Sequence, residues 1–252
     1  MYWRKKRSLR MLPQTDAVLG GVAALSKEAS AKIGAEEFEK CFKSWIQAVF
    51  EIAKSQIVAI DGKTLRRSYD RTSEKAPIHM VNAWSQANGL MLGQVKTRHK
   101  SNEITAIPEL LRMLELNGCI VTIDAMGCQK EIACQIIDQK SDYVLALKGN
   151  QGNLHDDVQL FFEDAQQCQF KDIAHNYHET IDGDHGRIET RRYWTVSDTD
   201  WIADKAKWAG LNLIGMVQSE REVGGNTTHE TRYYISSLPN DAKRFAEAVR
   251  GH

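Results

Sequence analysis

The sequence predicts an α/β protein with a mixed β-sheet that is covered by helices on both faces. Two short apolar runs that each end on an aspartate, residues 57–61 and 119–124, have the pattern of buried strands. Asn88-Gly89 lies between two further strand-like runs and is a typical hairpin turn, which predicts an antiparallel edge. Helical patterns then alternate with strands over 101–165, as in a sheet with a parallel centre.

The first half of the chain contains a helix, a strand, a hairpin and a second helix. Residues 36–50 place apolar side chains at three- and four-residue spacings, which predicts an amphipathic helix before the first aspartate strand. The runs 78–85 and 90–96 form the expected hairpin. The next helix spans about 101–116, and Pro108 inside it means that the first turn is either kinked or part of the loop.

After the second aspartate strand, helix and strand alternate again. A helix is expected over 130–139, a strand over 142–147, and then a helix that follows the loop 148–151 and ends near residue 165.

The residue pattern of the sequence changes after this helix. From 170 to 230 the sequence is polar, alternating and aromatic, which predicts a β-rich insertion in the α/β core. Strand candidates lie at 211–218, inside the insertion, and at 231–235, directly after it. A last helix begins near Asp241. We therefore expect four segments: an N-terminal segment 1–35, a core 36–169, the insertion 170–230, and a last strand with its helix over 231–252.

Composition places the chain among ordinary globular proteins. Lysine plus arginine and aspartate plus glutamate both number 33, so a uniformly basic surface is excluded but a local basic groove is not. Five cysteines without a C-x-x-C pair favour reduced thiols. No apolar run approaches the roughly 18 residues that span a bilayer, and the basic start lacks the features of a secretory signal. We expect a cytoplasmic protein without a membrane partner.

The two strand-end aspartates, Asp61 and Asp124, are the candidate metal ligands and catalytic residues. Carboxylate oxygens suit hard divalent cations, which disfavour histidine and thiol ligands. A cation held by two such carboxylates would serve phosphoryl chemistry. Two converging aspartates are the beginning of such a site.

Basic and polar residues beside these aspartates are candidate contacts to phosphate groups. Lys63 and Arg66 closely follow the first aspartate and would position phosphates, while Lys148 would contact a phosphate and Asn150 would shape the backbone. The alternative is solvated loop charge for the first two residues and a plain strand–helix turn for the others.

Six strings resemble, in order, the H-repeat-associated, ISAs-type (IS-four-like) insertion-sequence transposases, and the element order resembles the ribonuclease-H-like fold. The strings lie within residues 35–252: IVAIDGKTLRRSYD, KSNEITAIPELLRML, TIDAMGCQKEIA, DYVLALKGNQGNL, DHGRIETRRY and TRYYISSL…AKRFAEAVRGH. The resemblance implies DDE chemistry, in which three carboxylates hold two divalent ions, normally Mg²⁺. It also implies transposon ends and target DNA as partners, with a homodimer or a full-length transposase as a further partner.

The third carboxylate of the triad is the point at which the chain departs from this family. The family places it in a motif of His-Trp, two residues, then Glu, and the chain ends at His252, the first residue of that motif. Glu247 lies on the same helix but more than a turn early. Glu189 and Arg187, in the insertion, are candidates for a metal ligand and a DNA contact; the alternative for Glu189 is a contact with Arg191 or DNA.

Three hypotheses follow from the resemblance. The first is a transposase copy truncated at both ends and catalytically impaired, with Asp61 and Asp124 but without the family's glutamate. The second is a DNA-binding remnant that interferes with transposition without catalysis. The third is a non-transposase nuclease of the same fold, in which Glu189 completes the site.

Overall fold

The computed structural model describes most of the second half of the chain and parts of the first. The described residues are 37, 41, 44, 56–64, 79–87, 89–97, 103–184 and 186–252. The chain divides into two compact units, 1–48 and 49–252, and the fold below is that of the second. Arg66, the basic start and nearly all of the predicted helix 36–50 lie outside the described residues.

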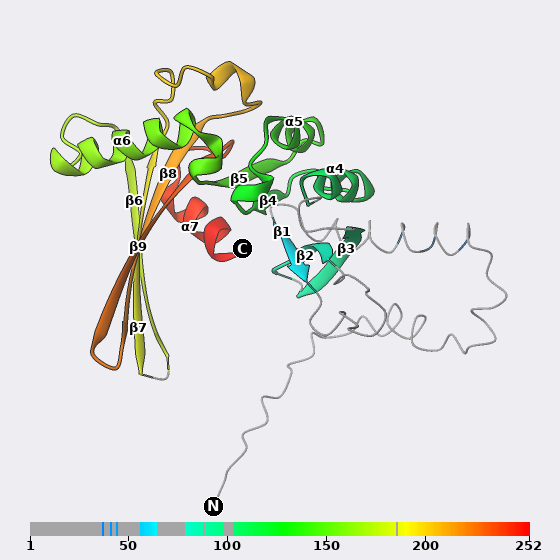
Figure 1. The fold of residues 1–252 in the computed structure, drawn as a ribbon, viewed down its shortest axis with the longest axis horizontal. Helices are drawn as coiled ribbons and strands as arrows, with labels where there is room; N and C mark the ends of the chain where they lie inside the picture. Colours follow the sequence, from blue (N-terminus) through cyan, green and yellow to red (C-terminus); the bar gives the residue numbers. More distant parts are fainter. Residues whose placement is uncertain are drawn as a thin grey trace, which may run out of the picture. The chain divides into compact units, whose positions relative to one another are not determined.

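A single nine-stranded sheet organises the second unit, with the strand order β3-β2-β1-β4-β5-β9-β8-β7-β6 (Figure 1). The strands are β1 Ile57–Thr64, β2 His79–Ser85, β3 Leu90–Thr97, β4 Ile120–Ile123, β5 Asp142–Leu147, β6 Asn176–Asp184, β7 Arg187–Val196, β8 Leu213–Val223 and β9 Asn226–Ser236. β1, β4 and β5 are parallel, whereas β2 and β3 form an antiparallel hairpin at one edge. The predicted mixed sheet is confirmed.

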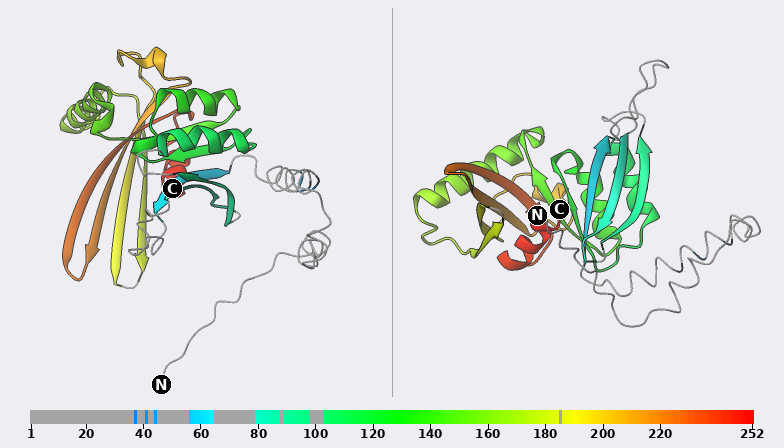
Figure 2. Two further views of the ribbon diagram at one scale, coloured as in Figure 1. Left: turned by 45° about the vertical axis from the view of Figure 1, so that its right-hand side comes forward. Right: turned by 90° about the horizontal axis from the view of Figure 1, so that it is seen from below.

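Helices cover both faces of this sheet, as predicted. They are α4 Glu103–Met113, α5 Lys130–Asp138, α6 Asn153–Gln167 and α7 Ala242–Arg250. Figure 2 shows α4 and α5 on one side of the sheet and α7 on the other. Pro108 lies inside α4, so the helix begins before it rather than after it. None of the helices in the described ranges is both long and apolar enough to cross a membrane.

The β-rich segment shares its sheet with the core. β9 pairs along its whole length with β8, and its last four residues also pair antiparallel with β5, from Leu147↔Tyr233 to Val144↔Ser236. We call the four strands β6–β9 the β-arm; Figure 1 shows its hairpin ends extending beyond α6 and α7.

The strands of the β-arm are longer than the sequence predicts. Gly224 and Gly225 adopt φ of 57° and 83°, the two positive values of a two-residue hairpin turn, so β8 runs to Val223 and β9 begins at Asn226. The expected strands, 211–218 and 231–235, stop short because the outer ends are exposed on both faces and lack an apolar alternation.

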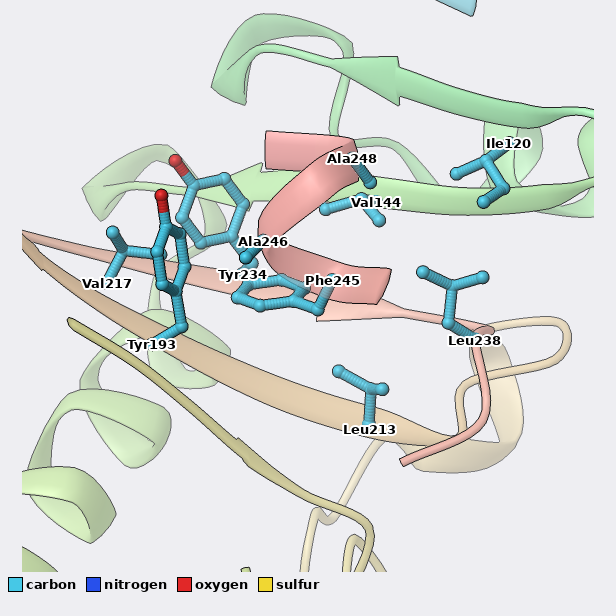
Figure 3. Packing of buried hydrophobic residues seen from close by; sticks show 10 residues of the cluster. All are labelled: Ile120, Val144, Tyr193, Leu213, Val217, Tyr234, Leu238, Phe245, Ala246 and Ala248. Carbon is cyan, nitrogen blue, oxygen red and sulfur yellow. The ribbon is translucent and has the colours of Figure 1, made fainter. Parts of the chain in front are cut away.

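Helix α7 joins the β-arm to the core on one face of the sheet. Its N-cap, Asp241, accepts hydrogen bonds from the backbone N–H groups of the first turn. Phe245 is fully buried, and its ring packs edge-on against Tyr193 and Tyr234, with centroids 6.4 and 5.5 Å away (Figure 3). Ile120 belongs to the same buried cluster, so a single apolar core lies beneath β4 and the β-arm.

Candidate active site

Asp61 and Asp124 lie on the same face of the sheet, but only Asp124 directly follows the end of its strand. The expectation of a strand-end aspartate is wrong for Asp61, because β1 stays paired with β2 as far as Thr64. Ile60 and Ile123 are register partners in the parallel pair β1–β4, and each aspartate is the next residue. Because side chains alternate along a strand and neighbouring strands lie about 4.8 Å apart, the two carboxylates leave the sheet side by side. They lie on the face covered by α7, since Ile120, four residues before Asp124, is in its core.

Each aspartate has one contact of its own. The Asp61 carboxylate, whose side chain is 45% exposed, lies 3.6 Å from the ammonium of Lys63. Asp124 is exposed, and its Oδ1 accepts a hydrogen bond from the backbone N of Met126 at 3.2 Å, which caps the short helix η2 Ala125–Gly127. Lys63 therefore lies beside the first candidate ligand.

Side chains of the loop after β5 donate hydrogen bonds to the backbone of the loop that follows Asp124. Asn150 donates its side-chain amide to the carbonyl of Ala125 at 2.8 Å, and Gln151 donates to the carbonyl of Cys128 at 2.5 Å. Lys148 is exposed at the end of β5 and makes no ion pair with a described residue. In this structure Asn150 positions the backbone beside Asp124, while Lys148 remains available to a ligand.

A cavity of about 540 Å³, which we call the basic groove, opens beside Asp124 between the parallel strand ends, the β-arm and α7. Three carboxylates line it, Asp124, Glu189 and Glu230, together with His252. Its six basic residues are Lys148, Arg187, Arg191, Arg221, Arg232 and Arg250. The groove lining thus carries an excess of three basic side chains, although lysine plus arginine and aspartate plus glutamate both number 33 in the whole chain. Arg232 pairs with Glu230 at 2.8 Å and Arg250 with Asp182 at 2.6 Å. Asp61 and Lys63 lie on β1, the strand next to β4, and are not part of its lining.

Glu189 is buried in the wall of this groove and is bound by two arginines. Its Oε1 accepts hydrogen bonds from Nε and Nη2 of Arg191 at 2.9 and 2.7 Å, and its Oε2 accepts one from Nη2 of Arg187. Burial alone would raise the pKa of the carboxyl group, but the hydrogen bonds and charges of both arginines outweigh it and hold the pKa below its ordinary value. Glu189 is therefore a carboxylate with both oxygens engaged.

The residues present match part of a divalent-metal site. Asp61 and Asp124 supply the oxygen ligands that Mg²⁺ prefers. Within the described part of the chain, no group of three or more His, Cys, Asp or Glu side chains is arranged to hold a metal ion. Glu247, the other acidic residue of interest, lies on α7 and pairs with Arg244 at 3.0 Å.

The end of α7 reaches the strand that carries Asp124. Nδ1 of His252 lies 3.2 Å from Oγ1 of Thr122, two residues before the aspartate. Gly251 allows this approach, because a Cβ there would lie 2.4 Å from Oε1 of Gln86 and 2.7 Å from Cγ2 of Ile57. The residues after α7 therefore pack against β4, close to Asp124.

Sequence reasoning missed most of the groove. It identified Lys148 and Arg187, and it named Arg191 as an alternative contact of Glu189, which is confirmed, but it did not identify Arg221, Arg232 and Arg250. A signal existed in the string RIETR, because residues two apart on a strand share a face. This spacing places Arg187, Glu189 and Arg191 together.

A mixed sheet of this strand order, with helices on both faces and an aspartate after each member of the register pair Ile60–Ile123 on two adjacent parallel strands, defines a ribonuclease-H-like protein of the type found in DDE transposases. Residues 52–251 match the family model described as "Transposase DDE domain". The chain belongs to this family.

Curated relatives agree with this assignment. The chain is 48% identical over 219 residues to the "Putative transposase YncI" of Escherichia coli O157:H7, covering 85% of this chain and 55% of the relative. It is 40% identical over 225 residues to the "H repeat-associated putative transposase YhhI" of Escherichia coli (strain K12), covering 87% of this chain and 59% of the relative. An "Uncharacterized protein in dhlA 3'region" of Xanthobacter autotrophicus is 44% identical over 211 residues, covering 83% and 70%. The chain thus spans a little over half the length of the two relatives named as transposases.

Proposed function

We propose that this chain acts on DNA as an insertion-sequence transposase with impaired catalysis. The observation that carries the proposal is the basic groove beside Asp124, in a chain whose overall formal charge is zero. Lysine and arginine side chains bind phosphates, and a local concentration of them favours a polyanion regardless of the net charge. The transposon ends and target DNA are the proposed substrates, and the cytoplasm the proposed compartment.

Asp61 and Asp124 are the proposed metal ligands, with Mg²⁺ as the ion and two ions as the family's arrangement. When bound, such ions supply charge stabilisation to the attacking and leaving oxygens of a phosphodiester. The chain's own residues orient the ligands: the backbone N–H of Met126 fixes the Asp124 carboxylate, and Asn150 fixes the backbone after it.

The proposed impairment is based on the ligand set of the described residues. Asp61 and Asp124 each follow a member of the register pair Ile60–Ile123, whereas both oxygens of Glu189 are held by arginines. A site with two of three ligands holds at least one ion loosely, so we expect weak or absent cleavage and strand transfer.

The proposed DNA contacts lie on both sides of the strand ends. Lys63 and Lys148 flank the two aspartates, and Arg187 lies in the groove wall. Arg66 is proposed from the sequence alone, since it lies outside the described residues. A homodimer or a complex with a full-length transposase is the proposed assembly.

A binding function without catalysis is the second candidate, favoured by the engagement of Glu189 with two arginines. Such a chain would occupy the transposon ends and interfere with transposition.

Titration of the 252-residue chain with a short duplex carrying the ends of its element tests the proposal, first in EDTA and then with Mg²⁺. We expect salt-sensitive binding in EDTA and little Mg²⁺-dependent cleavage. Absence of DNA binding at every salt concentration contradicts both candidates. Efficient Mg²⁺-dependent cleavage contradicts the impairment.

Asp124→Asn separates the two candidates, because it removes a ligand charge without removing a basic residue. We expect DNA binding in EDTA to be unchanged. For a weak nuclease, the residual Mg²⁺-dependent cleavage disappears in this variant; for a binding-only chain, wild type and variant are equally inactive.

A further inference from the structure

Arg187 and Arg191 converge on one carboxylate although they lie well apart on the chain. They are four residues apart on β7, which corresponds to roughly 13 Å along a strand. Nevertheless, Nη2 of each guanidinium donates to an oxygen of Glu189. The glutamate lies midway between them on the same face of the strand, so it determines where the two guanidinium groups meet.

Two guanidinium groups that are close enough to share one carboxylate repel each other unless an anion lies between them. Repulsion is strong where water is scarce, and only 7% of the surface of Glu189 is exposed. The carboxylate offsets this repulsion and supplies directed acceptors at the same time. Without it, we expect the two long side chains to separate.

Each arginine keeps donors that Glu189 does not use. A guanidinium has five N–H donors; Arg191 donates to Glu189 from Nε and Nη2, and Arg187 from Nη2. Both residues line the basic groove that contains Asp124. Arg221, the register partner of Glu189 on β8, adds a third cation to this face and has no ion pair with any described residue. This arrangement suits a phosphate, which accepts several hydrogen bonds from guanidinium groups.

We propose that Glu189 is a positioning residue that holds Arg187 and Arg191 together as a binding site for one phosphodiester group of DNA in the basic groove. This inference rests on the proposed function, because the ligand is the DNA of that function. It assigns to Glu189 an action through the arginines and not through a metal ion. Its loss therefore weakens DNA binding when no metal is present.

The experiment is a comparison of Glu189→Gln with wild type in EDTA, using fluorescence anisotropy of a short labelled duplex over a range of salt concentrations. The amide keeps the shape of the side chain but removes the charge that offsets the two guanidinium groups. We expect the affinity at about 0.15 M salt to fall roughly fivefold, because long-range attraction is screened there and direct contacts dominate. The slope of log K against log salt should also decrease in magnitude by about one, which corresponds to the loss of one phosphate contact.

Glu179→Gln is the matched control. Glu179 on β6 binds Arg192 on β7 at 2.9 Å, and the register places this pair on the face of the β-arm opposite to Glu189. The substitution removes the same charge from a similar ion pair outside the groove. We expect its affinity and salt slope to match those of wild type.

A second set of variants tests the inference independently of the stability of Glu189→Gln. If Glu189 acts through the arginines, adding Glu189→Gln to the Arg187→Gln/Arg191→Gln double variant produces no further loss of affinity. Glu189→Asp, which retains the charge, should recover part of the loss. Thermal unfolding of each variant shows that binding is measured on folded protein.

Three results overturn the inference. They are unchanged or tighter DNA binding by Glu189→Gln in EDTA, a defect that is present only with Mg²⁺, or a further loss in the double-arginine background. In each case wild type still binds DNA and the proposed function stands. Failure of wild type to bind DNA overturns both.

Discussion

At the scale of single residues, the local partners of each side chain determine its chemistry. Asp124 and Glu189 line the same groove, yet the first is exposed and contacts one backbone N–H, whereas the second is buried against two arginines. An exposed strand-end carboxylate is free to bind a cation, while a carboxylate with both oxygens engaged acts as part of an ion cluster. Position in a groove alone does not determine a role.

The depressed pKa of Glu189 predicts how its variants respond to acid. A carboxyl group whose pKa is lower in the folded than in the unfolded state stabilises the fold at pH values above its ordinary pKa of 4.5. This contribution disappears as the pH falls through the lower, folded-state pKa. We therefore expect Glu189→Gln to lose less stability than wild type on acidification below about pH 4.5. Urea unfolding at a series of pH values measures this, and parallel curves for the two proteins would contradict it.

Asn150 gives a second prediction at this scale. Asn150→Ala removes the donor to the carbonyl of the buried residue Ala125, so we expect a loss of about 1 kcal/mol of unfolding free energy. Gln129→Ala is the control, since its longer hydrogen bond to Met126, 3.4 Å, lies in the same loop. Chemical denaturation measures both variants. Equal effects would show that Asn150 has no special part in fixing this loop.

At the scale of elements, α7 is the piece that places the β-arm against the core. Its buried ring, Phe245, reaches across to β7, β8 and β9, and its last turn meets β4 through His252 and Thr122. The helix also forms an ion pair between its last residue, Arg250, and Asp182 of β6 at 2.6 Å. A single helix thus contacts both walls of the groove.

Gly215 on β8 tests this packing. A Cβ at this position would lie 2.4 Å from Cζ of the fully buried Phe245, so Gly215→Ala forces α7 away from the sheet. We expect a destabilisation of about 1–3 kcal/mol. Gly183→Ala on β6 is the control, because nothing lies within 4 Å of its added Cβ. Thermal and urea unfolding compare the two, and a neutral Gly215→Ala would contradict the packing argument.

At the scale of the whole molecule, charge is distributed unevenly over a neutral chain. Six basic and three acidic side chains line the groove, while the full sequence carries 33 of each sign. Electrostatic attraction to DNA depends on this local excess and on the ionic strength, not on the net charge.

Two arginine variants test this distribution. Arg221→Gln removes a cation from the groove, and Arg192→Gln removes one from the opposite face of the β-arm. We expect only Arg221→Gln to lower the slope of log K against log salt, by about one unit, although both variants change the net charge equally. Binding titrations in EDTA at several salt concentrations measure the slopes. Equal slopes for the two variants would show that DNA does not bind in the basic groove.

The parts that could be predicted from the sequence are those with a local physical signal. Buried parallel strands are continuous apolar runs, so the strands that carry Asp61 and Asp124 were predicted, and their register confirms that they are neighbours. The outer ends of β8 and β9 have polar residues on both faces and gave no such signal. The groove itself depends on the pairing of β9 with β5, which brings Arg232 and Lys148 into one wall and has no local sequence signature.

That pairing also has a mechanical consequence. Tyr233–Ser236 of β9 is hydrogen-bonded to β8 on one side and to β5 on the other. This segment therefore connects the β-arm to β5, the neighbour of β4, which Asp124 follows. A pull on the β-arm along its length loads these backbone hydrogen bonds together, in shear, instead of opening them one after another. The β9–β5 pairing is therefore a rigid connection. A tensile load applied at the hairpin ends is transmitted to β5 without first bending a flexible linker.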